Sequence, residues 1–134
     1  KRIEFLKVVI DRLQIHNVSL IHGRAEELGR DENFRNQFDY VVSRAVAELP
    51  VLLEYCIPFV QKGGYFVSYK SRRLDEEIEN ADNALNMLYT KYEKKYKYEL
   101  EYDHSERYLV FFRCENNTDS KYPRKPKKIK INPL

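Results

Sequence analysis

Apolar residues recur along the chain at two spacings, and together these spacings predict an α/β fold. Near the N-terminus, Ile3, Leu6, Ile10 and Leu13 follow one another at intervals of three and four residues, which is typical of one face of an amphipathic helix. The apolar stretch Val18–Gly23 then predicts a short strand. Short helical turns are predicted next, at Ala25–Arg30 and Asn33–Gln37.

The middle of the chain continues this alternation. Phe38–Arg44 is a nearly continuous apolar run, which favours a strand buried on both faces. Pro50 can begin a helix that reaches about Tyr55, because the first helical position needs no amide donor. A turn at Lys62–Gly64 then leads into a strand at Tyr65–Lys70.

The last third of the chain predicts one helix and two strands. Apolar residues from Leu74 to Leu88 recur at helical spacing. From Lys95 to Tyr102, three tyrosines and Leu100 alternate with charged residues, as in a strand with one solvated face. Tyr108–Phe112 is apolar or aromatic throughout, so these two strands should form an antiparallel pair. The whole pattern predicts a mostly parallel sheet with helices on both faces and a C-terminal antiparallel strand.

Positive charge is concentrated at the C-terminal end. The last fourteen residues contain six Lys and Arg and no acid, whereas residues 1–120 carry 18 Lys and Arg against 21 Asp and Glu. Pro123, Pro126 and Pro133 are expected to keep this arm out of regular structure. A basic arm suits a polyanion such as nucleic acid, and a solubilising terminus fits the charge equally well.

Length and composition fit one domain, with residues 1–114 as its body and residues 115–134 as the basic, proline-containing arm. The sequence has no apolar run long enough to span a bilayer, and Cys56 and Cys114 are too few for a disulfide framework or a zinc site. We therefore expect a cytoplasmic monomer with reduced cysteines, no metal and no membrane partner.

Charged residues follow the predicted strands at the edge where ligands bind in open α/β sheets. Such a basic set with one carboxylate pair, Glu26 and Glu27, suits a ligand that bears phosphate or carboxylate groups. No nucleophile motif or phosphate loop is evident, so we assign no catalytic residue. The charged residues are Arg24 and Glu26 after the first strand, Arg44 after the second, and Lys70, Arg72 and Arg73 after the third.

Five segments occur in an order that resembles one known family. They are GRAEEL (Gly23–Leu28), FDYVVSRAVAEL (Phe38–Leu49), KGGYFVSYKS (Lys62–Ser71), ERYLVFF (Glu106–Phe112) and KYPRKP (Lys121–Pro126). With the opening KRIEFL, they closely resemble the bacterial ribosomal small-subunit RNA methyltransferase G family, also called glucose-inhibited division protein B. The resemblance implies the class I S-adenosylmethionine-dependent methyltransferase fold, with a Rossmann-like sheet, and methylation of guanine N7 in 16S ribosomal RNA.

The resemblance also implies site residues. It places Ala25 and Glu26 at the adenine end of S-adenosylmethionine and Arg44 at the cofactor or substrate pocket. Guanine N7 has an in-plane lone pair and no proton, so the reaction needs alignment and exclusion of water rather than a general base. The candidate RNA contacts are Arg24, Lys70, Arg124 and Lys125.

The family carries a glycine-rich cofactor loop and a ribose-binding acid upstream of KRIEFL, and this sequence contains neither. No helix-capping residue precedes Lys1. We therefore expect an N-terminally truncated member that alone binds the cofactor weakly or not at all, with 16S ribosomal RNA or the small-subunit particle as its partner. Two alternatives stay open: a non-catalytic RNA-binding remnant that lacks the cofactor loop, and a methyltransferase for a protein or small molecule, against which the basic arm argues.

Overall fold

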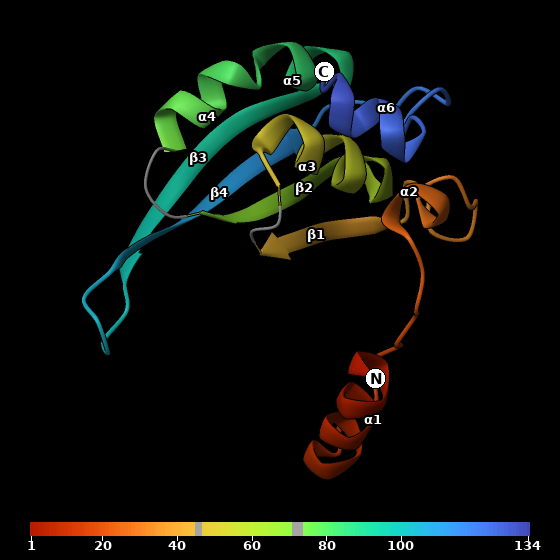
Figure 1. The fold of residues 1–134 in the computed structure, drawn as a ribbon, viewed down its shortest axis with the longest axis vertical. Coiled ribbons are helices and arrows are strands. Elements are labelled where there is room, and N and C mark those ends of the chain that lie inside the picture. The colour runs from red at the N-terminus through yellow and green to blue at the C-terminus, as the bar shows by residue number, and fades with distance from the viewer. Residues whose placement is uncertain (45–46, 71–73) are drawn as a thin grey trace.

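A four-stranded sheet lies at the centre of the computed structural model, which describes residues 1–44, 47–70 and 74–134 (Figure 1). The strand order is β1-β2-β4-β3. β1 and β2 are parallel, whereas β2–β4 and β3–β4 are antiparallel, so the expectation of a mostly parallel sheet is wrong. The strand bounds are Phe38–Arg44 for β1, Val60–Lys70 for β2, Thr90–Glu99 for β3 and Glu106–Cys114 for β4, which confirms the predicted strands in these regions.

The strand expected at Val18–Gly23 does not form, and the described sheet has one parallel pair, β1 with β2. The segment is an extended linker between α1 (Arg2–Leu13) and α2 (Ala25–Leu28), with Val18 and Ile21 exposed. A strand needs a neighbour for its backbone N–H and C=O groups, and no strand of the described sheet pairs with this segment. The apolar pattern of Val18–Gly23 is that of a strand, but the segment has no strand to pair with among the described residues.

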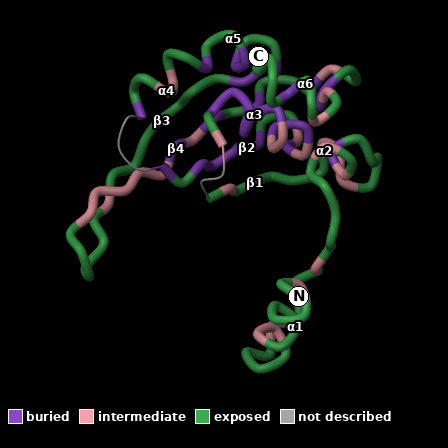
Figure 2. The backbone as a smooth tube through the Cα atoms, in the orientation of Figure 1, coloured by how far each residue is buried: buried purple, intermediate pink, exposed green. Residues whose placement is uncertain are grey.

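The N-terminal helix α1 stands apart from the sheet at the end of this linker (Figure 1). The predicted helix is confirmed, but none of its residues is buried, and Phe5 and Leu13 are about two-thirds exposed. Figure 2 shows the helix and the linker as exposed throughout most of their length. The apolar stripe of α1 thus contributes no buried residue to the core.

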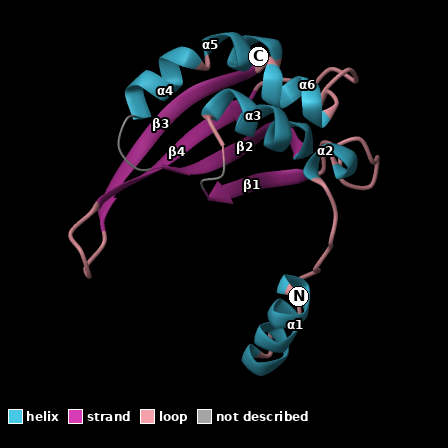
Figure 3. Cartoon of the chain, viewed as in Figure 1, coloured by secondary structure: helices cyan, strands magenta, loops and turns pink. Residues whose placement is uncertain are grey.

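Helices cover one face of the sheet (Figure 3). β1 was expected to be buried on both faces, yet Tyr40 and Val42 are more than 60% exposed, while Val41 between them packs against the core. The helix expected over residues 74–88 is divided at Ala81, whose φ of −95° and ψ of 3° leave the helical range. The helices beside the sheet are α3 (Leu49–Cys56), α4 (Leu74–Asn80), α5 (Asp82–Met87) and α6 (Pro126–Ile131).

The core lies between these helices and the sheet. Leu49 and Leu53 of α3 and Phe66 and Phe112 of β2 and β4 are fully buried, and the two phenylalanine rings stack with centroids 5.9 Å apart. Pro50 stands at the beginning of α3, as predicted, because its missing N–H has no intrahelical partner there. The core thereby fixes α3 over β1 and β2, next to the carboxyl ends of these two strands.

Lys62–Gly64 belongs to β2 and is not the expected turn. Gly63 has a φ of +84°, and a Cβ on Gly64 would lie 2.7 Å from the backbone oxygen of Asp39. The pairing register between β1 and β2 shifts at this point, between Phe38 and Tyr40. The two glycines therefore allow an irregular but continuous strand to pass close to β1.

The basic arm is folded against the body, and the expectation that its prolines exclude regular structure is wrong. Pro126 begins α6, where a missing amide donor costs nothing. Arg35 donates four hydrogen bonds of 2.7 to 2.9 Å to backbone oxygens, and three of these belong to Thr118, Asp119 and Tyr122 at the start of the arm. Arg30 also donates to backbone oxygens of this segment, so local proline content did not decide its structure.

Within the described residues, no helix combines the length and apolar character that a membrane span requires.

Candidate functional site

The first candidate residues lie at the beginning of α2. Arg24 is extended and precedes the helix, and Ala25 and Glu26 form its first turn. The Glu26 side chain is only 11% exposed, and its Oε1 lies 3.4 Å from Nη1 of the exposed Arg24. The backbone of Ala25 and the carboxylate of Glu26 therefore lie next to each other at the beginning of α2.

These residues line a cavity of about 780 Å³, which we call the larger cavity. Its lining residues come from the beginning of α2, the end of β1, the residues just before α3, α3 itself and the C-terminal segment. α3 contributes apolar and aromatic side chains to the lining, and α2 contributes Glu26. The lining residues are Arg24, Ala25, Glu26, Ser43, Ala47, Glu48, Val51, Leu52, Tyr55, Cys56, Lys130 and Pro133.

The titratable groups of α3 in the larger cavity are held in their neutral forms. Burial raises the pKa of the Cys56 thiol to about 12, although a hydrogen bond with Ser43 acts in the opposite direction. Burial, followed by the nearby carboxylates of Glu26 and Glu54, raises the pKa of Tyr55. A thiolate nucleophile at Cys56 is therefore disfavoured at neutral pH, and the cavity is suited to binding rather than to covalent chemistry.

Arg44 is exposed and does not line the larger cavity, whereas its neighbour Ser43 does. Successive residues of a strand point to opposite faces, and Val41, two residues before Ser43, packs against the core. This alternation was the available signal that Ser43 would face the helices. A role for Arg44 in ligand binding stays a prediction.

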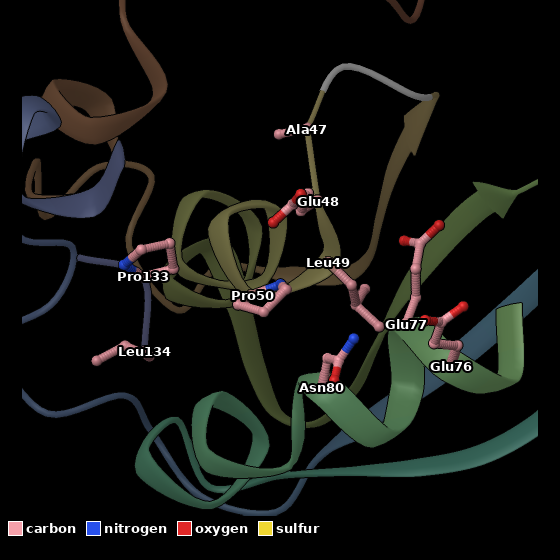
Figure 4. A pocket seen from close by; sticks show the side chains of 9 residues that line it. All are labelled: Ala47, Glu48, Leu49, Pro50, Glu76, Glu77, Asn80, Pro133 and Leu134. Atoms are coloured by element: carbon pink, nitrogen blue, oxygen red, sulfur yellow. The ribbon is translucent and has the colours of Figure 1, made fainter. Parts of the chain in front are cut away.

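A second cavity, of about 600 Å³, is shown in Figure 4, and we call it the smaller cavity. The two cavities share Ala47, Glu48 and Pro133 as lining residues, so these residues form the wall between them. Carboxylates and an amide make the smaller cavity rich in hydrogen-bond acceptors. Its lining consists of Ala47, Glu48, Leu49, Pro50, Glu76, Glu77, Asn80, Pro133 and Leu134.

Lys70 is the last residue of β2 and contacts two lining residues of the smaller cavity. It is 8% exposed, its Nζ is 2.6 Å from Oε2 of Glu77, and it also donates a 3.4 Å hydrogen bond to the backbone oxygen of Ala47. Its charge is thus engaged within the protein, and RNA contact by Lys70 stays a prediction. Arg72 and Arg73, which were expected beside it, lie outside the residues that the structure describes.

Arg124, another candidate RNA contact, pairs with Glu54 of α3. Glu54 is fully buried and the Arg124 side chain is 13% exposed, with Nη2 and Oε2 2.7 Å apart. Hydrogen bonding to Glu54 raises the pKa of Arg124 above its ordinary value, so the arginine stays charged. Lys125, in contrast, is exposed, and Lys121, Lys127, Lys128 and Lys130 are exposed with it.

Sequence reasoning missed the residues that the C-terminal segment and α3 bring to the cavities. Tyr55 and Cys56 sit at the end of a helix that the sequence predicted as part of the core, and Lys130 and Pro133 are more than a hundred residues from Ala25. No local pattern connects these positions. Only the docking of α6 beside α3 places them together.

The sequence as a whole is similar to one protein family. The sequence profile described as rRNA small subunit methyltransferase G (GidB) matches residues 1–105. The chain belongs to the rRNA small subunit methyltransferase G family. It is 46% identical, over its full length, to the ribosomal RNA small subunit methyltransferase G of Thermoanaerobacter sp. strain X514, and 46% identical over 126 residues, 94% of its length, to that of Alkaliphilus metalliredigens. The chain spans 56% and 53% of the lengths of these relatives.

A solved structure supports the fold assignment. The Trm5b protein from Pyrococcus abyssi superimposes with a TM-score of 0.58 at 18% identity, covering 83% of this chain and 34% of that protein. At this identity the likeness concerns the fold alone. The mixed α/β arrangement and the family assignment confirm the expected class I methyltransferase fold.

Proposed function

We propose that this chain carries part of an S-adenosylmethionine-dependent methyltransferase that acts on guanine N7 of 16S ribosomal RNA, in the cytoplasm. The observation that carries the proposal is the larger cavity, whose lining combines Ala25 and Glu26 with Ser43 near the end of β1, in a member of the rRNA small subunit methyltransferase G family. Ligands of open α/β sheets bind at the carboxyl ends of the strands, which is where this cavity lies.

The residues of the larger cavity fit the adenosine end of the cofactor. A purine ring needs apolar or aromatic walls, which Val51, Leu52 and Tyr55 supply, and its exocyclic amine needs an acceptor, which Glu26 supplies. The low exposure of Glu26 would strengthen that hydrogen bond. S-adenosylmethionine, when bound, supplies an electrophilic methyl group. The chain's own contribution would be to bind, orient and exclude water.

The smaller cavity suits the acceptor base. Guanine presents an N1–H and an exocyclic amine as donors, and a carboxylate can accept from both. Glu48 lines both cavities, so it would hold the base next to the cofactor. Acidic residues inside the cavity would select a base edge, while the exposed lysines of the arm would engage the RNA phosphates.

The experiment is isothermal titration of S-adenosylmethionine into two proteins: this chain, and this chain extended ahead of Lys1 with the upstream segment of the Thermoanaerobacter relative. We expect binding by the extended protein. Glu26→Ala should weaken it by about ten- to a hundredfold, the effect of losing a hydrogen bond to a charged group. Glu27→Ala is the matched control, because Glu27 is in the same helical turn but exposed and outside the cavity lining.

A non-catalytic RNA-binding remnant is the second candidate, because the exposed lysines of the arm suit RNA phosphates and such contacts need no cofactor. The two candidates differ in cofactor affinity. If neither protein binds S-adenosylmethionine while both bind 16S ribosomal RNA with strong salt dependence, the RNA-binding function is supported and the methyltransferase function is contradicted. Methyl transfer from labelled cofactor to 16S RNA by the extended protein would decide for the enzyme.

A further inference from the structure

One arginine connects α3 with both ends of the C-terminal helix. The backbone N–H of Arg124 donates to Glu54 Oε1 over 2.7 Å, its Nε donates to both carboxylate oxygens over 2.9 and 3.1 Å, and its Nη2 donates to Oε2 over 2.7 Å. The same Nη2 donates to the backbone oxygen of Asn132, directly after α6, over 3.0 Å. Arg124 thus contacts the backbone on the far side of the six-residue α6 and binds this segment to α3.

This helix needs such an anchor. A helix of six residues is not stable by itself in water, because nucleation fixes several residues for few hydrogen bonds. Apart from the ion pair, α6 has a fully buried Ile129 as its apolar contact. Within α6 itself, these two contacts are the ones that hold the helix, while Tyr122 before it and Leu134 after it pack against the core.

The position of α6 decides the shape of both cavities. Lys130 and Pro133 line the larger cavity, and Pro133 and Leu134 line the smaller one (Figure 4). If α6 left α3, both cavities would lose a wall. The smaller cavity would then open toward solvent on the side of the C-terminus.

The alternative role for Arg124 is direct contact with an RNA phosphate. Its side chain is 13% exposed, and its Nε and Nη2 already donate within the protein. Turning the guanidinium outward would leave Glu54 charged and fully buried without its partner, which is strongly unfavourable. Exposed cations are available close by at Lys125, Lys127 and Lys128.

We propose that Arg124 is a positioning residue, which holds the C-terminal segment 124–134 as the shared wall of the two cavities, and that the exposed lysines of this segment make its RNA contacts. The role of the wall in ligand binding rests on the proposed function. The anchoring itself does not.

The first test separates anchoring from phosphate contact by Arg124→Lys. A lysine keeps the charge that a phosphate needs but cannot reproduce the bidentate pair. We expect amide exchange of Ile129 and its neighbours in α6 to become about a hundredfold faster. N-ethylmaleimide, followed by peptide mass spectrometry, should react at least tenfold faster with Cys56, which lines the larger cavity. Lys125→Gln is the matched control and should leave both rates unchanged.

The second test removes the charge and keeps the anchor. In the double variant Glu54→Gln/Arg124→Gln, the amide nitrogen of Gln at 124 takes the place of the arginine Nε, which lies 2.9 Å from Glu54 Oε1. We expect α6 exchange to return toward wild type and the salt slope for binding a fluorescent RNA hairpin to stay the same. Lys125→Gln and Lys127→Gln should each lower this slope by about 0.9.

Three results would overturn the proposal. They are unchanged α6 exchange in Arg124→Lys, unchanged Cys56 reactivity in that variant, and a salt slope reduced by about one in the double variant. Exchange of β2 and β4 amides reports global unfolding, and the double variant decides the question if the lysine variant unfolds. Absence of RNA binding by the wild-type chain would contradict the proposed function, while the exchange and labelling results would still decide the anchoring.

Discussion

Arg35 offers a sharp test of how the C-terminal arm is held. Its two terminal nitrogens donate to the backbone oxygens of Gly29, Thr118, Asp119 and Tyr122, so a single side chain supplies four carbonyls with donors. Arg35→Lys retains the positive charge and the apolar stem. It replaces a planar fork with one ammonium group, which cannot reach four oxygens that surround a guanidinium.

The cost can be worked out from these contacts. An ammonium at the end of the lysine would reach one or two of the four oxygens, so at least two would lose their donor. Each carbonyl left unpaired costs about 1 kcal/mol or more, and water compensates in part because Arg35 is only half-buried. We therefore expect the free energy of unfolding to fall by about 2 kcal/mol.

Urea denaturation followed by circular dichroism measures this change. With an m value of about 2 kcal/mol per molar urea, the midpoint should fall by about 1 M while the slope stays constant. Arg12→Lys is the control, because Arg12 lies in the exposed α1 and its replacement should change stability by less than about 0.5 kcal/mol. Equal midpoints for the two variants would refute the view that Arg35 anchors the arm.

Two further predictions concern the sheet and the buried titratable groups. Gly64→Ala places a Cβ 2.7 Å from the backbone oxygen of Asp39 and should lower the free energy of unfolding by about 1–3 kcal/mol. Gly63→Ala has open space but a φ of +84°, and it should lower the free energy of unfolding by about 1 kcal/mol. If urea denaturation shows the larger loss for Gly63→Ala, the close approach of β1 and β2 is contradicted. Burial raises the pKa of Cys56 to about 12 from 9.0, and burial also raises that of Cys114. Because these thiols ionise at lower pH in the unfolded chain, the free energy of unfolding should fall as the pH rises above about 9. Thermal melts from pH 7.5 to 10.5 would measure this loss, and Cys56→Ala should reduce it; a pH profile identical in the wild type and the variant would show that Cys56 is not responsible.

The sequence by itself determined the features that depend on neighbouring residues. The bounds of β1, the beginning of α3 at Pro50 and the antiparallel pairing of β3 with β4 follow from apolar periodicity, from the lack of an amide in proline and from short chain connections. The motif resemblance also identified the family correctly. It placed Ala25 and Glu26 at the adenine end of the cofactor, which stays a prediction, and both residues line the larger cavity.

Tertiary structure decided what depends on partners far along the chain. Val18–Gly23 has a strand pattern but no pairing strand, and β1 has an apolar pattern but one open face. Arg124 has the sequence context of an RNA contact, yet it pairs with Glu54, seventy residues away, and thereby carries Pro133 to the cavities. A local pattern indicates which element a segment can form. Whether a strand finds a pairing strand, or a buried charge such as Glu54 finds an ion-pair partner, depends on residues that the folded chain brings within hydrogen-bonding distance.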